Sequence, residues 1–336
     1  MTMGDPAGVG PEVIVGAWGD ERIQSIARPF VIGHPEVLRR AAELLRRDVR
    51  IVEIASPADA EEHGDARVIP CLRGCSDEAK EVPPGRVDAR AGEAAYQAVR
   101  LAAEMALERK VDGIVTAPLS KAALHAAGHY YPGHTELLAE MCNVAEFAMM
   151  LYLPPGEAVR SPMGLGVAHV TLHQSLRSVF DDLTPSAIVA KCRLADGVMR
   201  RLGVERPRLA VCALNPHAGE DGLFGDEEST IIGPAVETAR RERLNVAGPF
   251  PTDTLMLRAR DGEFDAVVAM YHDQGHIALK LLGMHAAVNI TLGLPIVRTS
   301  VAHGTAFDRA WQGTARTEGM VAAVETAAKL CGSVVG

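Results

Sequence analysis

Short apolar runs alternate with longer amphipathic stretches along most of this chain. The apolar runs have the length and side-chain types of strands, and nine candidates follow this pattern: 30–32, 50–54, 113–116, 148–152, 166–170, 209–213, 266–270, 287–290 and 296–298. Hydrophobic residues recur with helical spacing over about 36–47, 91–108, 119–127, 135–142, 184–202, 227–243, 274–282 and 317–331. Strands separated by helices of this length predict βαβ units, a largely parallel sheet and the α/β fold class.

Two segments depart from this alternation. Residues 4–12 predict a strand-to-helix turn with Pro11 at the first helical position. Only Met1–Met3 precede this turn, so either the sequence is trimmed there or the first strand is very short. Residues 72–88 combine glycine, proline and charged residues, and they predict a surface excursion.

Length and composition narrow the class of protein. A chain of 336 residues exceeds the usual size of one hydrophobic core, so we expect two domains. The net charge is −9 and no lysine and arginine cluster is long enough to follow a phosphate backbone, which disfavours nucleic-acid binding. No apolar run approaches the length of a membrane helix. The six cysteines show no metal or redox spacing, which is typical of reduced thiols in a cytoplasmic protein.

Histidines follow several of the predicted strands, at the end of the strand where open α/β sheets bind ligands. Neutral imidazoles are good ligands for zinc and similar ions, and three protein ligands leave room for a substrate. His173, His217 and His272 are therefore the predicted metal ligands, with a structural or surface role as the alternative for each. His169 and His276 are weaker candidates, and supporting or structural roles are equally expected for them.

Three charged residues are further candidates for a site. Asp273 either orients His272 and contributes to the metal site or caps a helix. Lys280, about one helical turn beyond His276, is typical by itself of a solvated surface. Arg298 interrupts an apolar strand, so its guanidinium needs an anionic partner, either a substrate carboxylate or phosphate or a buried protein carboxylate.

Two helix starts are candidate phosphate sites. The glycine-rich opening offers bare N–H groups to a cofactor phosphate, although it lacks the usual dinucleotide fingerprint and a tight structural turn is an equal alternative. Its candidate cofactor-binding residues are Gly4, Asp5, Gly8 and Gly10. The second start is 133–136, where Thr135 binds an anion or caps the helix.

Taken together, these segments resemble the 4-hydroxythreonine-4-phosphate dehydrogenase family over essentially the whole chain. The matching segments are 4–12, 116–121, 133–137, 215–219 with 222–228, 270–275 and 288–304. The resemblance implies a fold similar to isocitrate and isopropylmalate dehydrogenases, with two α/β/α lobes and an active-site cleft between them. We expect 1–127 plus 300–336 to form the first lobe. We expect 128–299 to form the second lobe, which carries the metal and substrate residues and the dimer contact.

The resemblance also implies roles for individual residues. His173, His217 and His272 match the metal ligands of the family, which are shared between the partners of a homodimer. The matching substrate-binding positions are His134, Thr135, Lys280, Asn289 and Arg298. The expected cofactors are NAD or NADP and one divalent ion per site (Zn, Mg, Co or Mn). The catalytic candidates are Lys280 and Asp273, and either Lys280 or an ordered water moves the proton.

Within the family, residues 119–125, 129–134 and 275–283 resemble the branch that oxidises 4-phospho-D-threonate or 4-phospho-D-erythronate. We therefore expect oxidation of the 3-hydroxyl of a phosphorylated hydroxy acid, followed by decarboxylation. One alternative is the dehydrogenase of vitamin B6 synthesis. A second is a terephthalate dihydrodiol dehydrogenase, which residues 169–173 resemble, although those enzymes alter the region of His134 and Thr135. A metal-dependent phosphatase and a non-catalytic sugar-phosphate sensor are the remaining alternatives.

Overall fold

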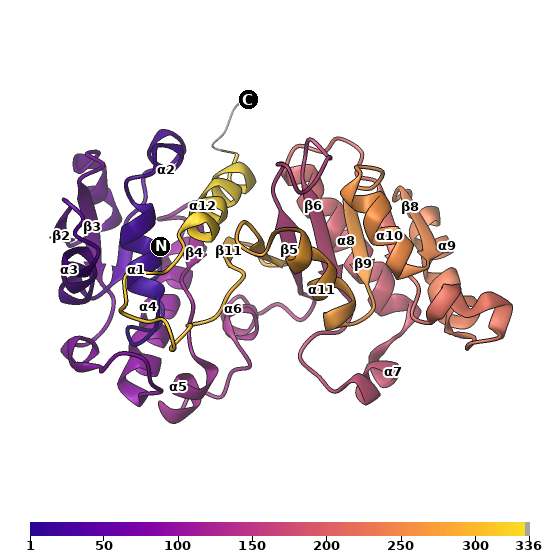
Figure 1. Ribbon diagram of the computed structural model, residues 1–336, viewed down its shortest axis with the longest axis horizontal. Helices are drawn as coiled ribbons and strands as arrows, with labels where there is room; N and C mark the ends of the chain where they lie inside the picture. The colour runs from indigo at the N-terminus through magenta and orange to yellow at the C-terminus, as the bar shows by residue number, and fades with distance from the viewer. Residues whose placement is uncertain (333–336) are drawn as a thin grey trace. The chain divides into compact units, whose positions relative to one another are not determined.

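The computed structural model describes residues 1–332, which form two compact units. Unit 1 comprises Met1–Ala145 and the described chain from Leu294 onward, drawn in indigo to purple and in yellow in Figure 1. Unit 2 comprises Glu146–Gly293. The cleft between two lobes that the resemblance implies stays a prediction.

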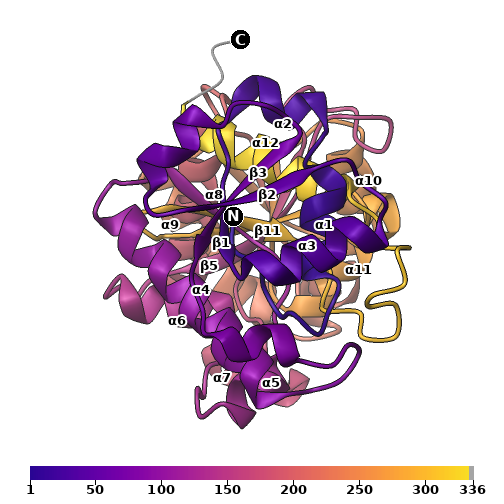
Figure 2. The same cartoon turned by 90° about the vertical axis from the view of Figure 1, so that its left-hand side faces the viewer.

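Unit 1 contains five parallel strands. They are β1 (Val31–Gly33), β2 (Arg50–Ile54), β3 (Val68–Arg73), β4 (Gly113–Thr116) and β11 (Val297–Val301). β3 lies between β1 and β2, and β4 pairs with β11. Thr2 forms parallel bridges to both Ile32 and Thr116, so the opening residues lie between β1 and β4. Figure 2 shows the N-terminus close to β1. The segment is held there by Thr2 N, which donates to Val115 O at 3.0 Å.

Two groups of helices pack against the strands of unit 1. One group contains α1 (Gly10–Ala17), α2 (Glu21–Ile26), α3 (Pro35–Leu44) and α12 (Glu318–Leu330), and α12 lies against β4 and β11. The other group contains α4 (Ala89–Leu107), α5 (Lys121–Ala126) and α6 (His134–Met141), and α4 lies against β1 and β4. The buried face of α4 is mostly alanine, which lets this long helix approach its neighbours closely. Two short 3₁₀ helices, η1 (Pro57–Glu62) and η2 (Asp77–Glu81), flank β3.

Unit 2 contains a mixed sheet of six strands. They are β5 (Ala148–Leu153), β6 (Leu165–His169), β7 (Leu209–Cys212), β8 (Val246–Phe250), β9 (Ala266–Ala269) and β10 (Val288–Leu292), in the spatial order β10-β5-β6-β9-β7-β8. β5 is antiparallel to both β10 and β6, whereas the other pairs are parallel. The α/β class is confirmed, and the sheet of this unit is mixed: β5 alone runs against the other five strands, which share one direction.

The helices of unit 2 lie on this mixed sheet. α8 (Pro185–Arg201) packs on β5, β6, β7, β9 and β10 and contacts α9 (Gly233–Arg241). α11 (His272–Gly283) packs on β5, β6 and β9, and α10 (Thr252–Arg260) packs on β7. The shorter helices are η3 (Leu176–Ser178), α7 (Val179–Asp182) and η5 (Glu228–Ile232), the last of which is a π-helix. The segment η4 (Pro216–Gly222) is a turn whose backbone is not helical. No helix within residues 1–332 is long and apolar enough to cross a membrane.

The nine predicted strands and eight predicted helices all occur, with bounds shifted by a few residues. The prediction of a surface excursion at 72–88 is wrong in part, because Cys75, Ala79 and Val82 are buried. Val82 packs in an apolar cluster with Ala7 and Ala91. These scattered apolar residues fix the segment against unit 1 despite its polar composition.

Candidate metal and substrate sites

Four of the five candidate histidines meet in unit 2, where β6 ends and α11 begins. His169 is the last residue of β6, and His272 is the first residue of α11. Nδ1 of His276 lies 3.0 Å from Nε2 of His169, and the ring of His272 stacks on His276 with 3.7 Å between centroids. The rings of His173 and His272 lie 5.9 Å apart, centroid to centroid.

His169 and His276 form the buried base of this cluster, with exposed fractions of 0% and 6%. Burial, together with the neighbouring imidazoles, lowers the pKa of each to about 3. Both rings are therefore neutral at physiological pH. They pack beneath His272, which is partly exposed, and His173, which is exposed.

Hydrogen bonds from Gln274 position the start of α11. Its Oε1 accepts from Met270 N at 2.7 Å, and its Nε2 donates to Ala213 O at 2.7 Å and to Thr252 Oγ1 at 3.0 Å. The single side chain thus ties α11 to the segments that follow β9 and β7. This fixes the backbone that carries His272.

Asp273 lies beside His272, with 2.7 Å between its Oδ1 and the ring Nδ1. A carboxylate in this place favours the tautomer that leaves Nε2 as an electron-pair donor, an arrangement found in many metal sites. His272 therefore fits a metal ligand. Lys280 is half-buried on α11, and its charge contributes to the lowered pKa of His276.

His217 lies on an exposed turn after β7, and its ring centroid is 6.3 Å from that of Phe224. No group of three or more His, Cys, Asp or Glu side chains within residues 1–332 is arranged to hold a metal ion. A single chain thus brings His173 and His272 near each other but does not bring His217 into one group with them. The resemblance implies that the metal ligands come from two chains of a homodimer, and one chain then holds only part of the ligand set.

Unit 1 holds Arg298, the second residue of β11. The sequence predicted it at the end of a strand, which is wrong because β11 continues to Val301. Its side chain is 2% exposed, and Nη2 donates to Thr116 Oγ1 at 2.7 Å. Burial lowers the pKa of Arg298 to about 10, and the Glu136 carboxylate opposes this effect. The guanidinium is therefore still charged at neutral pH, in a buried place.

His134, Thr135 and Glu136 form the first turn of α6, in the same unit. Thr135 is buried, and burial together with the charge of Arg298 lowers the pKa of His134 well below its usual value. Within the described part of the chain, the buried Nε2 of His134 has no hydrogen-bond partner. A helix N-terminus, a neutral imidazole and a guanidinium thus lie together, and this combination can bind an anion.

Asn289 lies on β10 in unit 2, where its Nδ2 donates to Met149 Sδ at 3.2 Å. Its buried Oδ1 accepts no hydrogen bond from any group in residues 1–332. An amide oxygen of this kind is an acceptor that a hydroxyl group of a ligand can satisfy.

The glycines of the opening segment are covered by protein. A Cβ on Gly4 would lie 2.3 Å from Pro118 O, one on Gly8 2.9 Å from Thr305 Cβ, and one on Gly10 2.4 Å from Met3 O. Close packing therefore accounts for these three residues. Asp5 is fully buried, its Oδ1 accepts from Ala7 N at 2.8 Å, and burial raises its pKa to about 6. The cofactor-binding role of this segment stays a prediction.

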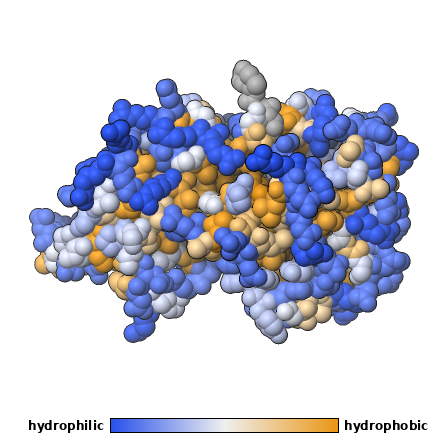
Figure 3. All heavy atoms as spheres, turned by 180° about the vertical axis from the view of Figure 1, so that it is seen from behind, coloured by the Kyte–Doolittle hydropathy of each residue, from blue (hydrophilic) through white to orange (hydrophobic). Residues whose placement is uncertain are grey.

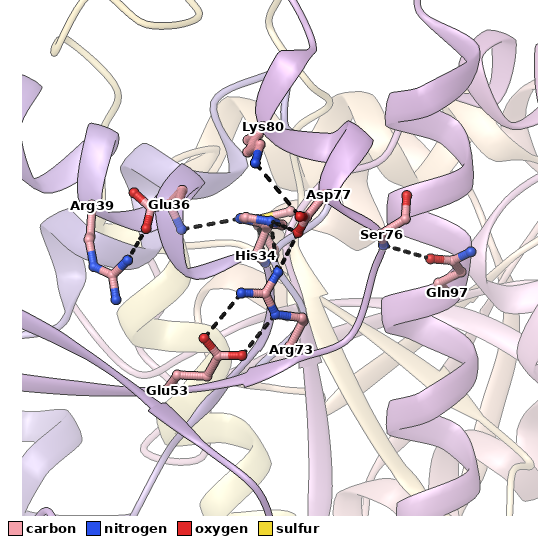
Figure 4. A network of polar contacts seen from close by, with 10 residues as sticks. His34, Glu36, Arg39, Glu53, Arg73, Ser76, Asp77, Lys80 and Gln97 are labelled. Carbon is pink, nitrogen blue, oxygen red and sulfur yellow. Dashed lines mark hydrogen bonds and ion pairs between the residues drawn. The ribbon is translucent and has the colours of Figure 1, made fainter.

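A charged network at the ends of β1 and β3 was not predicted (Figure 4). Arg73 donates to both carboxylate oxygens of Glu53, at 2.8 and 3.1 Å, and also contacts Asp77. The buried His34 ring accepts from Glu36 N at the start of α3 and lies 3.1 Å from Asp77. The opposite charges offset one another, so the guanidinium of Arg73 is already paired with carboxylates, and exposed pairs of this kind contribute little to stability.

Imidazoles near strand ends and a buried arginine beside a helix N-terminus are typical of α/β enzymes that act on small anionic substrates. The chain belongs to the family described as pyridoxal phosphate biosynthetic protein PdxA, which it matches over residues 25–327. It is therefore an oxidative decarboxylating dehydrogenase of that family.

Similar proteins match almost the full chain. The D-threonate 4-phosphate dehydrogenase of Pectobacterium atrosepticum is 44% identical over 335 residues, covering 98% of each chain. The 4-hydroxythreonine-4-phosphate dehydrogenase of Trichlorobacter lovleyi is 45% identical over 333 residues, covering 98% of this chain and 96% of the relative. The crystal structure of 4-hydroxythreonine-4-phosphate dehydrogenase from Klebsiella pneumoniae has a TM-score of 0.85 at 45% identity and covers 98% of each chain.

Proposed function

We propose that this enzyme oxidises the 3-hydroxyl of a 4-phosphorylated hydroxy acid, with 4-phospho-D-threonate preferred. NAD or NADP accepts the two electrons, and a divalent ion supplies a Lewis acid that polarises the reacting oxygen. The β-keto acid formed by the oxidation then loses CO₂. The observation that carries this proposal is the near full-length similarity to D-threonate 4-phosphate dehydrogenases, together with an anion site built around the buried Arg298.

The anion site of unit 1 supports a substrate with strong negative charge. Arg298 can donate two parallel N–H groups to a carboxylate or phosphate, and Thr116 holds its Nη2 in place. The N-terminal turn of α6 adds backbone N–H groups, and the uncharged His134 offers a ring N–H without introducing a second buried cation. We assign His134, Thr135 and Arg298 to substrate binding on this basis.

We propose that His173, His217 and His272 hold the divalent ion, with ligands contributed by two chains. The donor set is chemically suitable, since the contact of Asp273 with Nδ1 leaves Nε2 of His272 available for a metal. Lys280 lies on the same helix, and we propose that it takes up or returns the proton of the substrate hydroxyl. Asn289 would then hydrogen-bond the substrate through its buried Oδ1.

Exposed hydrophobic side chains on unit 2 support a homodimer. They are Leu176 and Phe180 near α7, Leu223 and Phe224 after the His217 turn, and Ile277, Leu281 and Met284 on and just after α11. The space-filling view also shows hydrophobic residues at the surface among hydrophilic ones (Figure 3). Leu281 is 83% exposed, and it is one of three large hydrophobic residues exposed on and just after α11. We propose that a second copy of the chain covers these residues.

The main alternative is the amino analogue, 4-hydroxythreonine 4-phosphate, which is the substrate named for the Trichlorobacter lovleyi relative. An aromatic dihydrodiol is disfavoured, because His134 and Thr135 are both kept and the charged Arg298 is buried beside them.

A turnover comparison tests the proposal. The purified enzyme, supplied with NAD or NADP and Zn, Mg, Co or Mn in turn, should produce NADH or NADPH absorbance with 4-phospho-D-threonate. The rate should exceed those with 4-phospho-D-erythronate and 4-hydroxythreonine 4-phosphate, measured side by side. Faster turnover of 4-hydroxythreonine 4-phosphate would overturn the substrate assignment, and no turnover of any of these acids would overturn the proposed reaction.

A further inference from the structure

The turn that follows β7 has a backbone conformation that L-amino acids rarely adopt. Five consecutive residues have φ angles of 54°, 55°, 81°, 44° and 53°, which place them in the left-handed region: His217, Ala218, Gly219, Glu220 and Asp221. Four of the five carry a Cβ, and each of these is disfavoured by contact between its Cβ and the following carbonyl oxygen. Such a run persists only where its surroundings fix it. We call residues 217–221 the left-handed turn.

A buried carboxylate fixes the entry to the left-handed turn. Glu228 is 7% exposed, and its Oε1 accepts from Leu214 N at 2.8 Å and from Asn215 N at 2.7 Å. Its Oε2 accepts from Asn215 Nδ2 at 3.0 Å. Burial by itself would raise the pKa of Glu228, but these hydrogen bonds outweigh that effect and the pKa is lowered. The group is therefore a charged acceptor held by three N–H donors.

The same carboxylate also lies against the middle of the left-handed turn. A Cβ on Gly219 would lie 2.8 Å from Glu228 Oε2, so only glycine leaves room for this contact. Gly219 O accepts from Phe224 N at 3.1 Å, which closes the far side of the turn. Asn215 makes a further hydrogen bond, at 2.6 Å, to Glu227 Oε2. The anchor is thus buried and rigid, whereas His217 at the start of the turn is exposed.

We propose that Glu228 is a positioning residue for His217. Its buried carboxylate, acting through Asn215 and the backbone at Gly219, holds the left-handed turn so that the exposed imidazole points to a divalent ion. The inference rests on the proposed function in one respect, which is that His217 binds a metal ion. The observation behind it is that a buried carboxylate fixes a disfavoured backbone conformation directly at an exposed histidine.

Glu228→Gln tests this inference, with Glu220→Gln as its matched control. Glutamine at 228 keeps one acceptor oxygen but directs an NH₂ group towards Asn215 Nδ2, so that hydrogen bond is lost. Glu220 is an exposed carboxylate of the same turn, and Glu220→Gln removes the same charge without touching this hydrogen bond. Cobalt(II) is titrated into the metal-free full-length protein. We expect the Kd of Glu228→Gln to rise about tenfold or more, as for other residues that orient metal ligands. The Kd of Glu220→Gln should stay within about twofold of the wild type.

A second measurement separates positioning from metal binding. In metal-free protein with ¹³C-labelled histidine, the His217 ring signal, assigned with His217→Ala, should move in Glu228→Gln and not in Glu220→Gln. If His217→Ala binds cobalt as tightly as the wild type, the ligand assignment is wrong, whereas a displaced His217 signal still supports the positioning role. An unchanged Kd together with an unchanged ring signal in Glu228→Gln overturns the inference.

A folding defect in Glu228→Gln leaves the inference testable through Gly219→Ala. In this variant Glu228 is unchanged, but a methyl group on residue 219 would lie 2.8 Å from its Oε2 and displace the turn from the carboxylate. It should weaken cobalt binding and displace the His217 signal in the same way. Wild-type values for both would count against the proposal.

Discussion

Replacing Asp5 by asparagine should stabilise the protein at neutral pH and remove one source of its pH dependence. Asp5 is fully buried, and its Oδ2 has no hydrogen-bond partner within residues 1–332. Burial raises its pKa from 3.8 to about 6. Between these two values the native state keeps the proton and the unfolded state releases it. Stability contributed by Asp5 is therefore present at low pH and is lost as the pH rises to about 6.

The magnitude follows from the same two pKa values. A rise from 3.8 to about 6 corresponds to about 3 kcal/mol of unfolding free energy lost above pH 6. Asparagine keeps an oxygen for the 2.8 Å hydrogen bond from Ala7 N, and its NH₂ group replaces the unpaired Oδ2 without a charge. We expect Asp5→Asn to be more stable than the wild type by about 1–3 kcal/mol at pH 7.5 and by close to zero near pH 4.

Chemical denaturation of both proteins at several values between pH 4 and pH 8 measures this difference. The difference between the variant and the wild type isolates Asp5 from all other titrating groups, which are common to both proteins. A difference that does not change with pH, or a variant less stable than the wild type at pH 7.5, would refute the reasoning. The KM for NAD of the same variant tests the cofactor role that the sequence predicts for the opening segment.

Three further substitutions have defined outcomes. Thr116→Val removes the hydrogen bond to Arg298 Nη2, so it should lower the free energy of unfolding by about 1.5–3 kcal/mol. It should also raise the KM for the phosphorylated acid more than it lowers kcat, and an unchanged KM would argue against Arg298 as a substrate-binding residue. His173→Ala should abolish metal binding, measured by calorimetry, and turnover while circular dichroism stays native; an active variant would remove His173 from the ligand set. Leu281→Asp should convert a dimer to a monomer by light scattering without unfolding the chain, and an undisturbed dimer would exclude this face of α11 from the contact.

Hydrophobic pattern predicted most of the fold, and the two missed strands have a physical explanation. β3 lies between two parallel neighbours but contains Pro70, a residue that normally argues against a central strand because it lacks an N–H group. β8 contains Gly248 and Pro249, and it pairs on one side only, with an irregular register against β7. In both strands, tertiary pairing overrides the local signal.

The candidate site was only partly predictable, because its contacts join residues far apart along the chain. His169 and His276 are 107 residues apart, and Thr116 and Arg298 are 182 apart, so residue type indicated the chemistry but not the contact. Glu228 was missed because residues 226–228 are an acidic run that is typical of a solvated surface. Nothing in the sequence distinguishes its buried carboxylate from the exposed Asp226 beside it.

The division of the chain has a consequence for its synthesis. Unit 1 begins at the N-terminus, but it receives β11 and α12 only after the whole of unit 2 has been made. The first strand of unit 2, β5, pairs with its last strand, β10, and Ala148 lies opposite Leu292. The two ends of unit 2 are therefore adjacent within its own sheet. On the ribosome, unit 2 can therefore fold as soon as β10 has emerged, while the first 145 residues still expose the strand edge that β11 will cover. The interval between synthesis of β4 and synthesis of β11 therefore sets how long this strand edge stays unpaired.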